Sequence, residues 1–357
     1  MKKQKSVLLG MSGGVDSSVA ALLLKKRGYN VIGAFMKNFS DKNASNNQCN
    51  WKEELKSAKK IASLLNVKLI ILDSEKQYKT QVLNPMFRAY KKGLTPNPDI
   101  FCNTIIKFPL LWKEAKKLKA DCIATGHYAR IKKTLKGFQL LQGKDKSKDQ
   151  SYFLSELSQS DLQHIIFPIG NLTKSEVRKI AEKNKFPNYD KKGTAGICFI
   201  GKINMKSFLE RRIKNKEGKV LDPEGNIIGK HPGSMYFTIG QRIGSRLGFE
   251  IKKHLKGKWY IAEKRRNNII IIAPKNSPLL KKQKLKIKKI HLINPKEKIP
   301  SNLKARIRHL GKLHKGKLSK KNHYYFTFFK PVEQIAPGQS IVIYNRINLI
   351  GKGEIAA

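Results

Sequence analysis

Acidic residues are scarce in this chain of 357 residues. The sequence has 25 aspartates and glutamates against 74 lysines and arginines, which gives a formal net charge of +49. A positive field of this size favours a polyanionic partner. Because 40% of the residues are hydrophobic and apolar runs alternate with turn residues throughout, the chain is not a disordered basic tail.

Cysteine is also rare, with four residues in the whole chain. None of them shows CxxC spacing or a nearby histidine at ligand spacing, which argues against a structural zinc site. We therefore expect no metal bound by protein ligands alone. A small disulfide-stapled scaffold is excluded by the length of the chain, and any chemistry of these cysteines is thiol chemistry.

Long hydrophobic runs are absent. No stretch approaches the roughly 18 apolar residues that a membrane span requires, and residues 1–5 lead into a short strand-like run without the apolar core of a signal peptide. We expect a cytoplasmic protein with no membrane partner.

The first half of the chain alternates short apolar runs with helical patterns. An apolar run from Lys5 to Met11 precedes a helix expected over Asp16–Lys26, and the pattern continues with strands expected at 31–36, 67–73 and 121–125 and helices at 51–65 and 104–119. This alternation predicts an α/β fold with a doubly wound parallel sheet. Ligands of such sheets bind at the carboxyl ends of the strands, which points to the loops after Met11, Met36 and Thr125.

The pattern changes after about residue 201. A helix expected over Met205–Ile213 is followed by short segments separated by Gly and Pro, which indicates a small α+β domain. From Pro278 short β-like runs predict a β-barrel, with strands expected at 285–290, 304–308, 324–329 and 340–344. We therefore divide the chain into domains 1–204, 205–275 and 276–357. The last of these has 19 basic and 3 acidic residues, so a polyanion should contact it.

The most specific local signal is Gly10–Ser18, GMSGGVDSS, between a buried strand and a helix. Adjacent glycines let the backbone approach a phosphate, while serine hydroxyls and the free amides at a helix N-terminus donate to anionic oxygens. The loop has no lysine at the Walker A position, which argues against P-loop phosphoryl transfer. Asp16 beside phosphates suggests that Mg²⁺ accompanies the nucleotide.

This loop resembles the motif of the PP-loop ATP pyrophosphatases, which adenylate a carbonyl oxygen and release pyrophosphate. Four further segments resemble, in this order, the tRNA-specific 2-thiouridylase family: NPDIFCN at 97–103, TGHYAR at 125–130, KDQSYFL at 148–154 and GICFI at 196–200. The resemblance runs essentially from end to end, through Pro337-Gly338-Gln339. It implies a PP-loop, HUP-like first domain.

The resemblance also implies a reaction, the ATP-dependent 2-thiolation of the wobble uridine of tRNA. The C2 oxygen of the uridine is adenylated, and sulfur is then transferred from a cysteine persulfide of the enzyme, giving 2-thiouridine, AMP and pyrophosphate. The implied cofactors are ATP and Mg²⁺. The implied partners are tRNA and a protein that donates the persulfide, either a sulfur-carrier protein or a cysteine desulfurase.

Sulfur transfer of this kind needs two cysteines, because a second thiol releases the sulfur by thiol exchange and leaves a disulfide. Cys102 and Cys198 lie in segments that we interpret as turn-rich, where a thiol can be exposed. By the family's pattern Cys102 is the nucleophile and Cys198 carries the persulfide. Cys122 lies in an apolar strand and is expected in the core, and nothing supports a role for Cys49.

The resemblance assigns further residues. For the nucleotide it implies Gly10, Met11, Ser12, Gly13, Gly14, Val15, Asp16 and Ser17, with Met36 and Gly126 for the nucleoside. For the flipped uridine it implies Asn97, Pro98 and Asp99, with Asp99 also a catalytic candidate. For tRNA it implies Lys148, Asp149, Gln150, Arg308 and His309, with His127 and Gln339 near the base.

Two alternatives remain at this point. A PP-loop enzyme that adenylates a small molecule would need neither the basic C-terminal barrel nor the pair Cys102 and Cys198. A basic RNA-binding protein with a decayed nucleotide site would not need the intact SGGVDSS loop.

Overall fold

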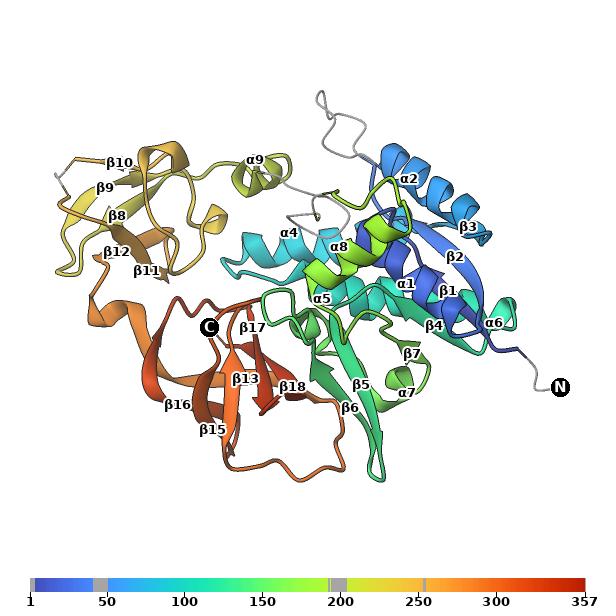
Figure 1. Cartoon of the computed structure of the whole chain (residues 1–357). Coiled ribbons are helices and arrows are strands. Elements are labelled where there is room, and N and C mark those ends of the chain that lie inside the picture. The colour runs from blue at the N-terminus through green and yellow to red at the C-terminus, as the bar shows by residue number, and fades with distance from the viewer. Residues whose placement is uncertain (1–3, 41–50, 192, 194–203, 253–254, 357) are drawn as a thin grey trace.

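The computed structural model describes residues 4–40, 51–191, 193, 204–252 and 255–356 (Figure 1). Cys49 and Cys198 lie outside these residues. None of the described helices is long and apolar enough to cross a bilayer.

The N-terminal sheet has five strands, and each neighbouring pair is parallel. Their order is β3 (Lys68–Asp73), β2 (Asn30–Lys37), β1 (Ser6–Gly10), β4 (Cys122–Thr125) and β7 (Ile165–Ile166). The expected parallel sheet is confirmed, and its longer strands match the expected ranges closely.

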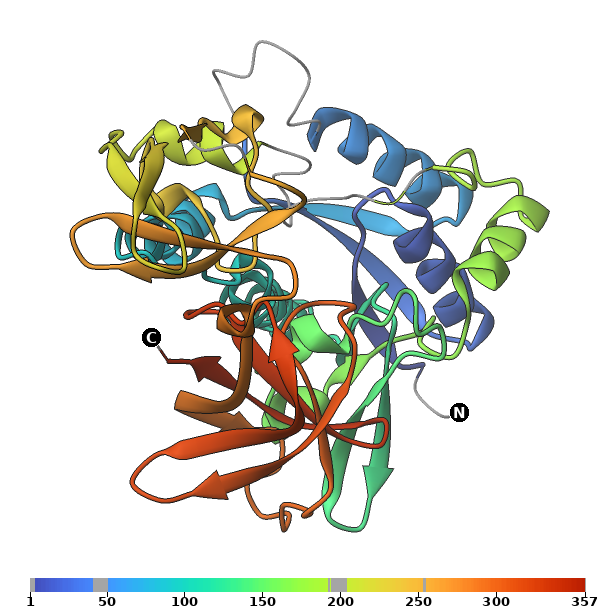
Figure 2. The same cartoon turned by 90° about the vertical axis from the view of Figure 1, so that its left-hand side faces the viewer.

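Helices cover both faces of this sheet, because successive side chains of a strand point to opposite sides. Val7 and Leu9 of β1 pack in one cluster with residues of helices α1 (Val15–Lys26), α2 (Trp51–Leu64) and α8 (Lys174–Lys183). Leu8 joins the opposite cluster with Leu111 of α6 (Phe108–Lys117). Figure 2 shows α1, α2 and α8 together on one side of the sheet.

A run of short helical segments connects β3 to β4. These segments are α3 (Glu75–Tyr78), a π-helix (Lys79–Leu83), α4 (Asn84–Lys91), α5 (Pro98–Phe101) and a second π-helix (Cys102–Lys107), which continues into α6. The helix expected over 104–119 thus begins six residues earlier, at Pro98. The Asn97 side chain accepts a hydrogen bond from the Ile100 amide at 3.2 Å, and Pro98 occupies the first helical position. Asn followed by Pro therefore begins a helix here.

The next domain is built on a mixed sheet. After α9 (Met205–Glu210), shorter than expected, the sheet order is β10 (Glu250–Ile251), β9 (Ile227–His231), β8 (Gly218–Leu221), β12 (Ile269–Pro274) and β11 (Trp259–Arg265). The β12–β8 pair is parallel and the other pairs are antiparallel. The expectation of a small α+β unit is confirmed.

Six antiparallel strands close the C-terminal barrel. In order around it they are β13 (Lys281–Leu292), β16 (Tyr324–Glu333), β15 (His314–Lys320), β14 (Leu303–Arg306), β17 (Ser340–Asn345) and β18 (Asn348–Ile355), and β18 pairs again with β13. The expected barrel is confirmed, although β15 and β18 were not foreseen.

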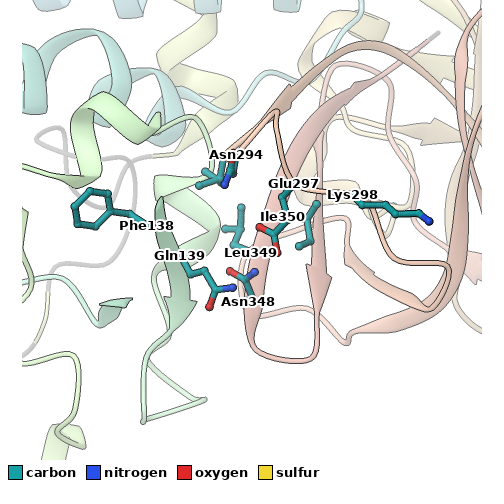
Figure 3. A pocket seen from close by; sticks show the side chains of 9 residues that line it. Phe138, Gln139, Asn294, Glu297, Lys298, Asn348, Leu349 and Ile350 are labelled. Atoms are coloured by element: carbon teal, nitrogen blue, oxygen red, sulfur yellow. The ribbon is translucent and has the colours of Figure 1, made fainter. Parts of the chain in front are cut away.

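A hairpin from the N-terminal half joins this barrel. Strands β5 (Ala129–Thr134) and β6 (Gly137–Gln142) pair with each other, and Leu140 of β6 pairs with Leu349 of β18. Figure 3 shows Gln139 of the hairpin near Leu349 and Asn348 of the barrel, and these residues line one small pocket together with Phe138. The first and last parts of the sequence therefore share one continuous sheet of eight strands.

The remaining short elements lie in connections. They are α7 (Gln159–Leu162) and the 3-10 turns Ser151–Leu154, Ser234–Tyr236, Ser245–Leu247 and Pro278–Leu280.

Candidate functional site

The three loops expected to form the site meet at one edge of the parallel sheet. Gly10, the last residue of β1, pairs with Thr125, the last residue of β4, and the Met11 amide donates to the Ala34 carbonyl of β2 at 2.8 Å. Strands β2 and β4 lie on opposite sides of β1, so the strand order reverses here. This is the point where open α/β sheets bind ligands.

The glycine-rich loop is held by its own serines. The hydroxyls of Ser17 and Ser18 each donate to the Gly14 carbonyl at 3.0 Å, and the Ser12 amide donates to Ser17 Oγ at 3.2 Å. Gly14 is the N-cap of α1 and has no side chain to cap the helix. The amides of the first helical turn are therefore placed to bind an anion rather than a capping side chain.

Two glycines of the site are required by close packing. Gly13 has a φ of +75°, and a Cβ there would lie 2.2 Å from the Glu54 carbonyl oxygen of α2. A Cβ on Gly126 would lie 2.9 Å from the Ser17 amide nitrogen. The loop after β4 therefore lies directly against the start of α1, as the assignment of both loops to one site requires.

Asp16 has two partners that the sequence did not reveal. Its Oδ1 lies 2.6 Å from Lys174 Nζ of α8 and accepts a hydrogen bond from the Tyr128 hydroxyl at 2.7 Å. Burial, and then the charge of Asp16, raise the pKa of Tyr128, so its hydroxyl remains a donor. Tyr128 stands inside the TGHYAR segment, whereas Lys174 lies in no quoted motif and carries no local signal of its role.

The segment 148–150 connects this cluster to the barrel. The Gln150 side chain accepts a hydrogen bond from the Tyr128 amide at 3.0 Å, and the Gln150 amide donates to the Tyr128 carbonyl at 2.9 Å. The fully buried Asp149 carboxylate lies 2.7 Å from Arg306 of β14 and also accepts from the Gly143 and Ser151 amides. The Asp149 side chain therefore does not reach the surface, whereas the neighbouring Lys148 is exposed.

Cys102 differs from the sequence interpretation. It is the first residue of the second π-helix and is completely buried, so the expectation of an exposed thiol in a turn is wrong. The helix start at Asn97 and Pro98 turns the Cys102 side chain into the core cluster. The neighbouring Asn103 donates to the Asp99 carbonyl at 3.0 Å, which ties the cysteine segment to the residues expected to meet the uridine. Met36 lies in the same core cluster, at the end of β2.

His127 lies in an apolar environment beside this site. Its ring stacks on the Phe108 ring with 5.9 Å between the ring centroids, and it meets the edge of the Phe167 ring with 6.0 Å between the centroids. Its Nδ1 hydrogen-bonds with Thr125 Oγ1 at 2.7 Å. Burial, and then the charge of Lys107, lower the pKa of His127 well below its usual value. The imidazole is therefore neutral at physiological pH, which argues against a role as a general acid.

The barrel brings its expected contacts toward the same region. The Thr95 amide donates to the Pro337 carbonyl at 2.9 Å, so the turn that carries Gln339 packs against the chain just before Asn97. The centroids of the His309 and Phe153 rings are 4.1 Å apart. Burial lowers the pKa of His309 to about 4. Arg308 donates a hydrogen bond to the Gln334 side chain.

Comparison with known proteins decides the family. The family model described as "tRNA methyl transferase HUP domain" matches residues 5–202, more than half of the chain, and models described as "tRNA methyl transferase PRC-barrel domain" and "Aminomethyltransferase beta-barrel domain" match 206–274 and 282–355. The "tRNA-specific 2-thiouridylase MnmA 2" of Aliarcobacter butzleri is 39% identical over 365 residues, covering 100% of this chain and 99% of that one. The "tRNA-specific 2-thiouridylase MnmA 1" of Geobacillus kaustophilus is 41% identical over 358 residues, covering 99% and 96%. The chain belongs to the tRNA-specific 2-thiouridylase family.

The resemblance stated from the sequence motifs is therefore confirmed along the full length of this thiouridylase-family chain. The model descriptions mention methyl transfer, whereas the full-length relatives are named 2-thiouridylases. Each of these relatives covers the whole chain, whereas each family model covers one domain, so the relatives decide the activity of the family.

Cys122 provides a test of which thiols in this thiouridylase-family chain are reactive. It begins β4, is half-buried, and burial followed by the charge of Asp121 raises its pKa to about 11. At pH 7.5 it is almost entirely protonated, and the thiolate is the reactive form. Peptide mapping after iodoacetamide treatment at pH 7.5 should find Cys122 unmodified under conditions that alkylate free glutathione completely. Rapid alkylation of Cys122 in the folded protein would contradict this.

Proposed function

We propose that this protein is a tRNA-uridine 2-sulfurtransferase that converts the wobble uridine of tRNA to 2-thiouridine. The observation that carries the proposal is the full-length similarity to 2-thiouridylases, and the glycine-rich loop at the carboxyl edge of the parallel sheet supports it. The basic barrel supports tRNA as the substrate, since neutralised phosphates stabilise such complexes.

The reaction divides into two steps. In the first, the uridine C2 oxygen attacks the α-phosphate of ATP, forming a C2–O–AMP bond and releasing pyrophosphate. In the second, the terminal sulfur of the persulfide on Cys198 attacks C2 and AMP leaves. The Cys102 thiol, which is buried in the core cluster, must become accessible in the complex with tRNA for this step. Its thiolate then attacks Cys198 Sγ, so that the sulfur stays on C2 as a thiocarbonyl and a disulfide joins the two cysteines. An external thiol reduces this disulfide before the next turnover.

The geometry of the phosphate loop supports its proposed role in binding ATP. Gly10 to Ser17 would hold the ATP phosphates, because the first-turn amides of α1 point to one anion site. Met36 and Gly126 stand at the ends of β2 and β4 and would contact the nucleoside.

Mg²⁺ fits this loop as a companion of the nucleotide. Among the described residues no group of three His, Cys, Asp or Glu side chains could hold a metal ion alone. Asp16 would be the single protein carboxylate, with phosphate oxygens and water completing the oxygen ligands that Mg²⁺ prefers. When bound, Mg²⁺ would neutralise charge on the departing pyrophosphate.

The tRNA would contact both the first and the last parts of the chain. Asn97, Pro98 and Asp99 would meet the flipped uridine, with His127 and Gln339 near it. Lys148 and Gln150 would meet the tRNA backbone and Asp149 would position them, while Arg308 and His309 would add contacts from the barrel. We propose domains 1–204, 205–275 and 276–357 for this assignment. The reaction would take place in the cytoplasm, and a separate protein would donate the persulfide.

The test is mass spectrometry of nucleosides from unmodified tRNA incubated with the protein, ATP, Mg²⁺ and sulfide. We expect 2-thiouridine at the wobble position, formed only when ATP is present. Adenylation of a small molecule instead would give pyrophosphate release without dependence on tRNA. An RNA-binding protein with an inactive nucleotide site would bind tRNA and release no pyrophosphate.

A further inference from the structure

The outer surface of the barrel carries a concentrated group of lysines. Along β13, Leu285 and Ile287 point into the barrel core, as do Phe326 and Phe328 of β16. Because side chains alternate between the two faces of a strand, the residues between them point outward. On β15, Leu318 packs against the same core, so Lys317 and Ser319 on either side of it point outward as well. The outward residues of the three strands form what we call the outer lysine face: Lys284, Lys286, Lys288, Tyr325, Thr327, Phe329, Lys315, Lys317 and Ser319.

The strand register places lysines of the outer lysine face on both sides of Thr327. Lys284 and Lys317 both pair with Thr327, one from each neighbouring strand, and Lys286 pairs with Tyr325. With strands about 4.8 Å apart, Lys284 and Lys317 stand roughly 10 Å from each other across Thr327. Like charges this close repel in the absence of an anion.

Acidic residues do not balance this charge. Residues 276–357 contain three acids, Glu297, Glu333 and Glu354, and none of them is among the outward residues of the face. Glu333 stands at the end of β16, opposite Lys281, and Glu354 pairs with Ser340 on the other side of the barrel. Within the described residues of the barrel domain, 276–356, no acidic side chain stands among the outward residues of the face, so the face offers positive charge that an anionic partner would neutralise.

Aromatic rings lie among the lysines. The Nζ of Lys284 lies 4.6 Å from the centre of the Tyr325 ring, and 49% of the surface of Phe329 is exposed. Lysines that bind phosphates beside rings that contact sugars or bases are typical of surfaces that bind nucleic acid.

The face is continuous with the barrel end that belongs to the candidate site. Lys281, at the start of β13, pairs with Glu333, the residue before Gln334, whose side chain binds Arg308. From this end β13 runs away from Arg308 at about 3.3 Å per residue, so Lys288 lies roughly 23 Å from Lys281. The lysines thus extend the expected Arg308 contact along the barrel.

We propose that the outer lysine face is a second tRNA-binding surface, which binds the phosphodiester backbone of the substrate at a distance from the reacting uridine. This inference rests on the proposed function for the identity of the RNA. The face contributes affinity and orientation rather than chemistry, because it lies outside the phosphate loop and the Cys102 segment.

The experiment compares two triple variants with the same loss of charge. The first is Lys284→Gln/Lys286→Gln/Lys317→Gln, on the face. The matched control is Lys26→Gln/Lys113→Gln/Lys116→Gln, three exposed lysines on α1 and α6. The Kd for unmodified tRNA is measured for each variant and for the unsubstituted protein at several salt concentrations. A third variant, with arginine at positions 284, 286 and 317, keeps the charge.

We expect the slope of log Kd against log salt to fall by about 2 to 3 for the face variant, at roughly 0.7–0.9 per lost phosphate contact. Its tRNA binding at 0.1 M salt should weaken about tenfold or more. The control variant and the arginine variant should keep the original slope. Equal slopes for the face variant and the control variant would overturn the proposal, because the charge would then act only through the overall field.

The same samples separate this inference from the proposed function. If the unsubstituted protein forms no 2-thiouridine but the face variant still loses its salt slope, the face binds RNA and the assigned reaction is wrong. If 2-thiouridine forms and both glutamine variants bind tRNA alike, the reaction holds and the face is not a tRNA surface. Stronger loss of binding to anionic lipid vesicles than to tRNA would also overturn it.

Discussion

A protein carrying Cys102→Ser should release pyrophosphate when tRNA and ATP are added and yet form no 2-thiouridine above background. The first step uses the phosphate loop and no thiol. The second step ends with a thiolate attacking Cys198 Sγ in the disulfide that links Cys198 to the C2 sulfur. A serine hydroxyl at neutral pH is neither ionised enough nor reactive enough toward sulfur to replace that thiolate. Pyrophosphate reports the first step and 2-thiouridine reports the second step, and both are measured in the same reaction.

Cys122→Ser is the matched control for this experiment. Cys122 is half-buried with a raised pKa, and we expect both steps to continue at their original rates when it is replaced. Because Cys102 is completely buried in the core cluster, its replacement by a polar hydroxyl costs about 1–3 kcal/mol of stability, which thermal unfolding will detect. Normal thiolation by a folded Cys102→Ser protein would remove Cys102 from the reaction.

Asp16→Asn should have the opposite effect and slow the first step itself. We expect tRNA-dependent pyrophosphate release to fall about 10² to 10³-fold, the range found when one positioned electrostatic group is removed from an active site. An amide oxygen can still accept from the Tyr128 hydroxyl, but it carries no charge to balance Lys174 at 2.6 Å or to bind Mg²⁺. Pyrophosphate release over a range of ATP and Mg²⁺ concentrations measures the loss.

Lys144→Gln provides the comparison for Asp16→Asn. Lys144 pairs with Glu176 of α8 at 3.0 Å on the exposed side of the same helix that carries Lys174. Exposed pairs of this kind contribute little to stability, so pyrophosphate release should remain within about twofold. If Asp16→Asn behaves like Lys144→Gln, Asp16 does not belong to the site.

The periodicity of hydrophobic residues predicted much of the fold, whereas the differences between prediction and structure arise at single residues. Short apolar runs separated by helical patterns predicted the parallel sheet, because both faces of such a sheet are buried and its strands are continuously hydrophobic. Asn97-Pro98 can begin either a turn or a helix, and only the packing of the following residues against the core decided for the helix. That choice buried Cys102.

The candidate site was predictable where its residues are adjacent in the sequence. The glycines and serines of the phosphate loop form one local motif, and Gly126 follows a predicted strand. Lys174 and Asp16 are 158 positions apart and meet only because α8 packs beside α1. No local pattern encodes a pairing of this kind, so it was missed.

The hairpin that joins the barrel affects how the chain is made. Leu140 of β6 pairs with Leu349 of β18, and a ribosome adding about 5–20 residues per second produces those residues roughly 10 to 40 s apart. During that interval the outer edge of β6 is an unpaired strand edge, which attracts other strands. Completion of the N-terminal half therefore waits for the final residues of the chain, and a protein shortened before β18 would leave the nascent hairpin open to aggregation.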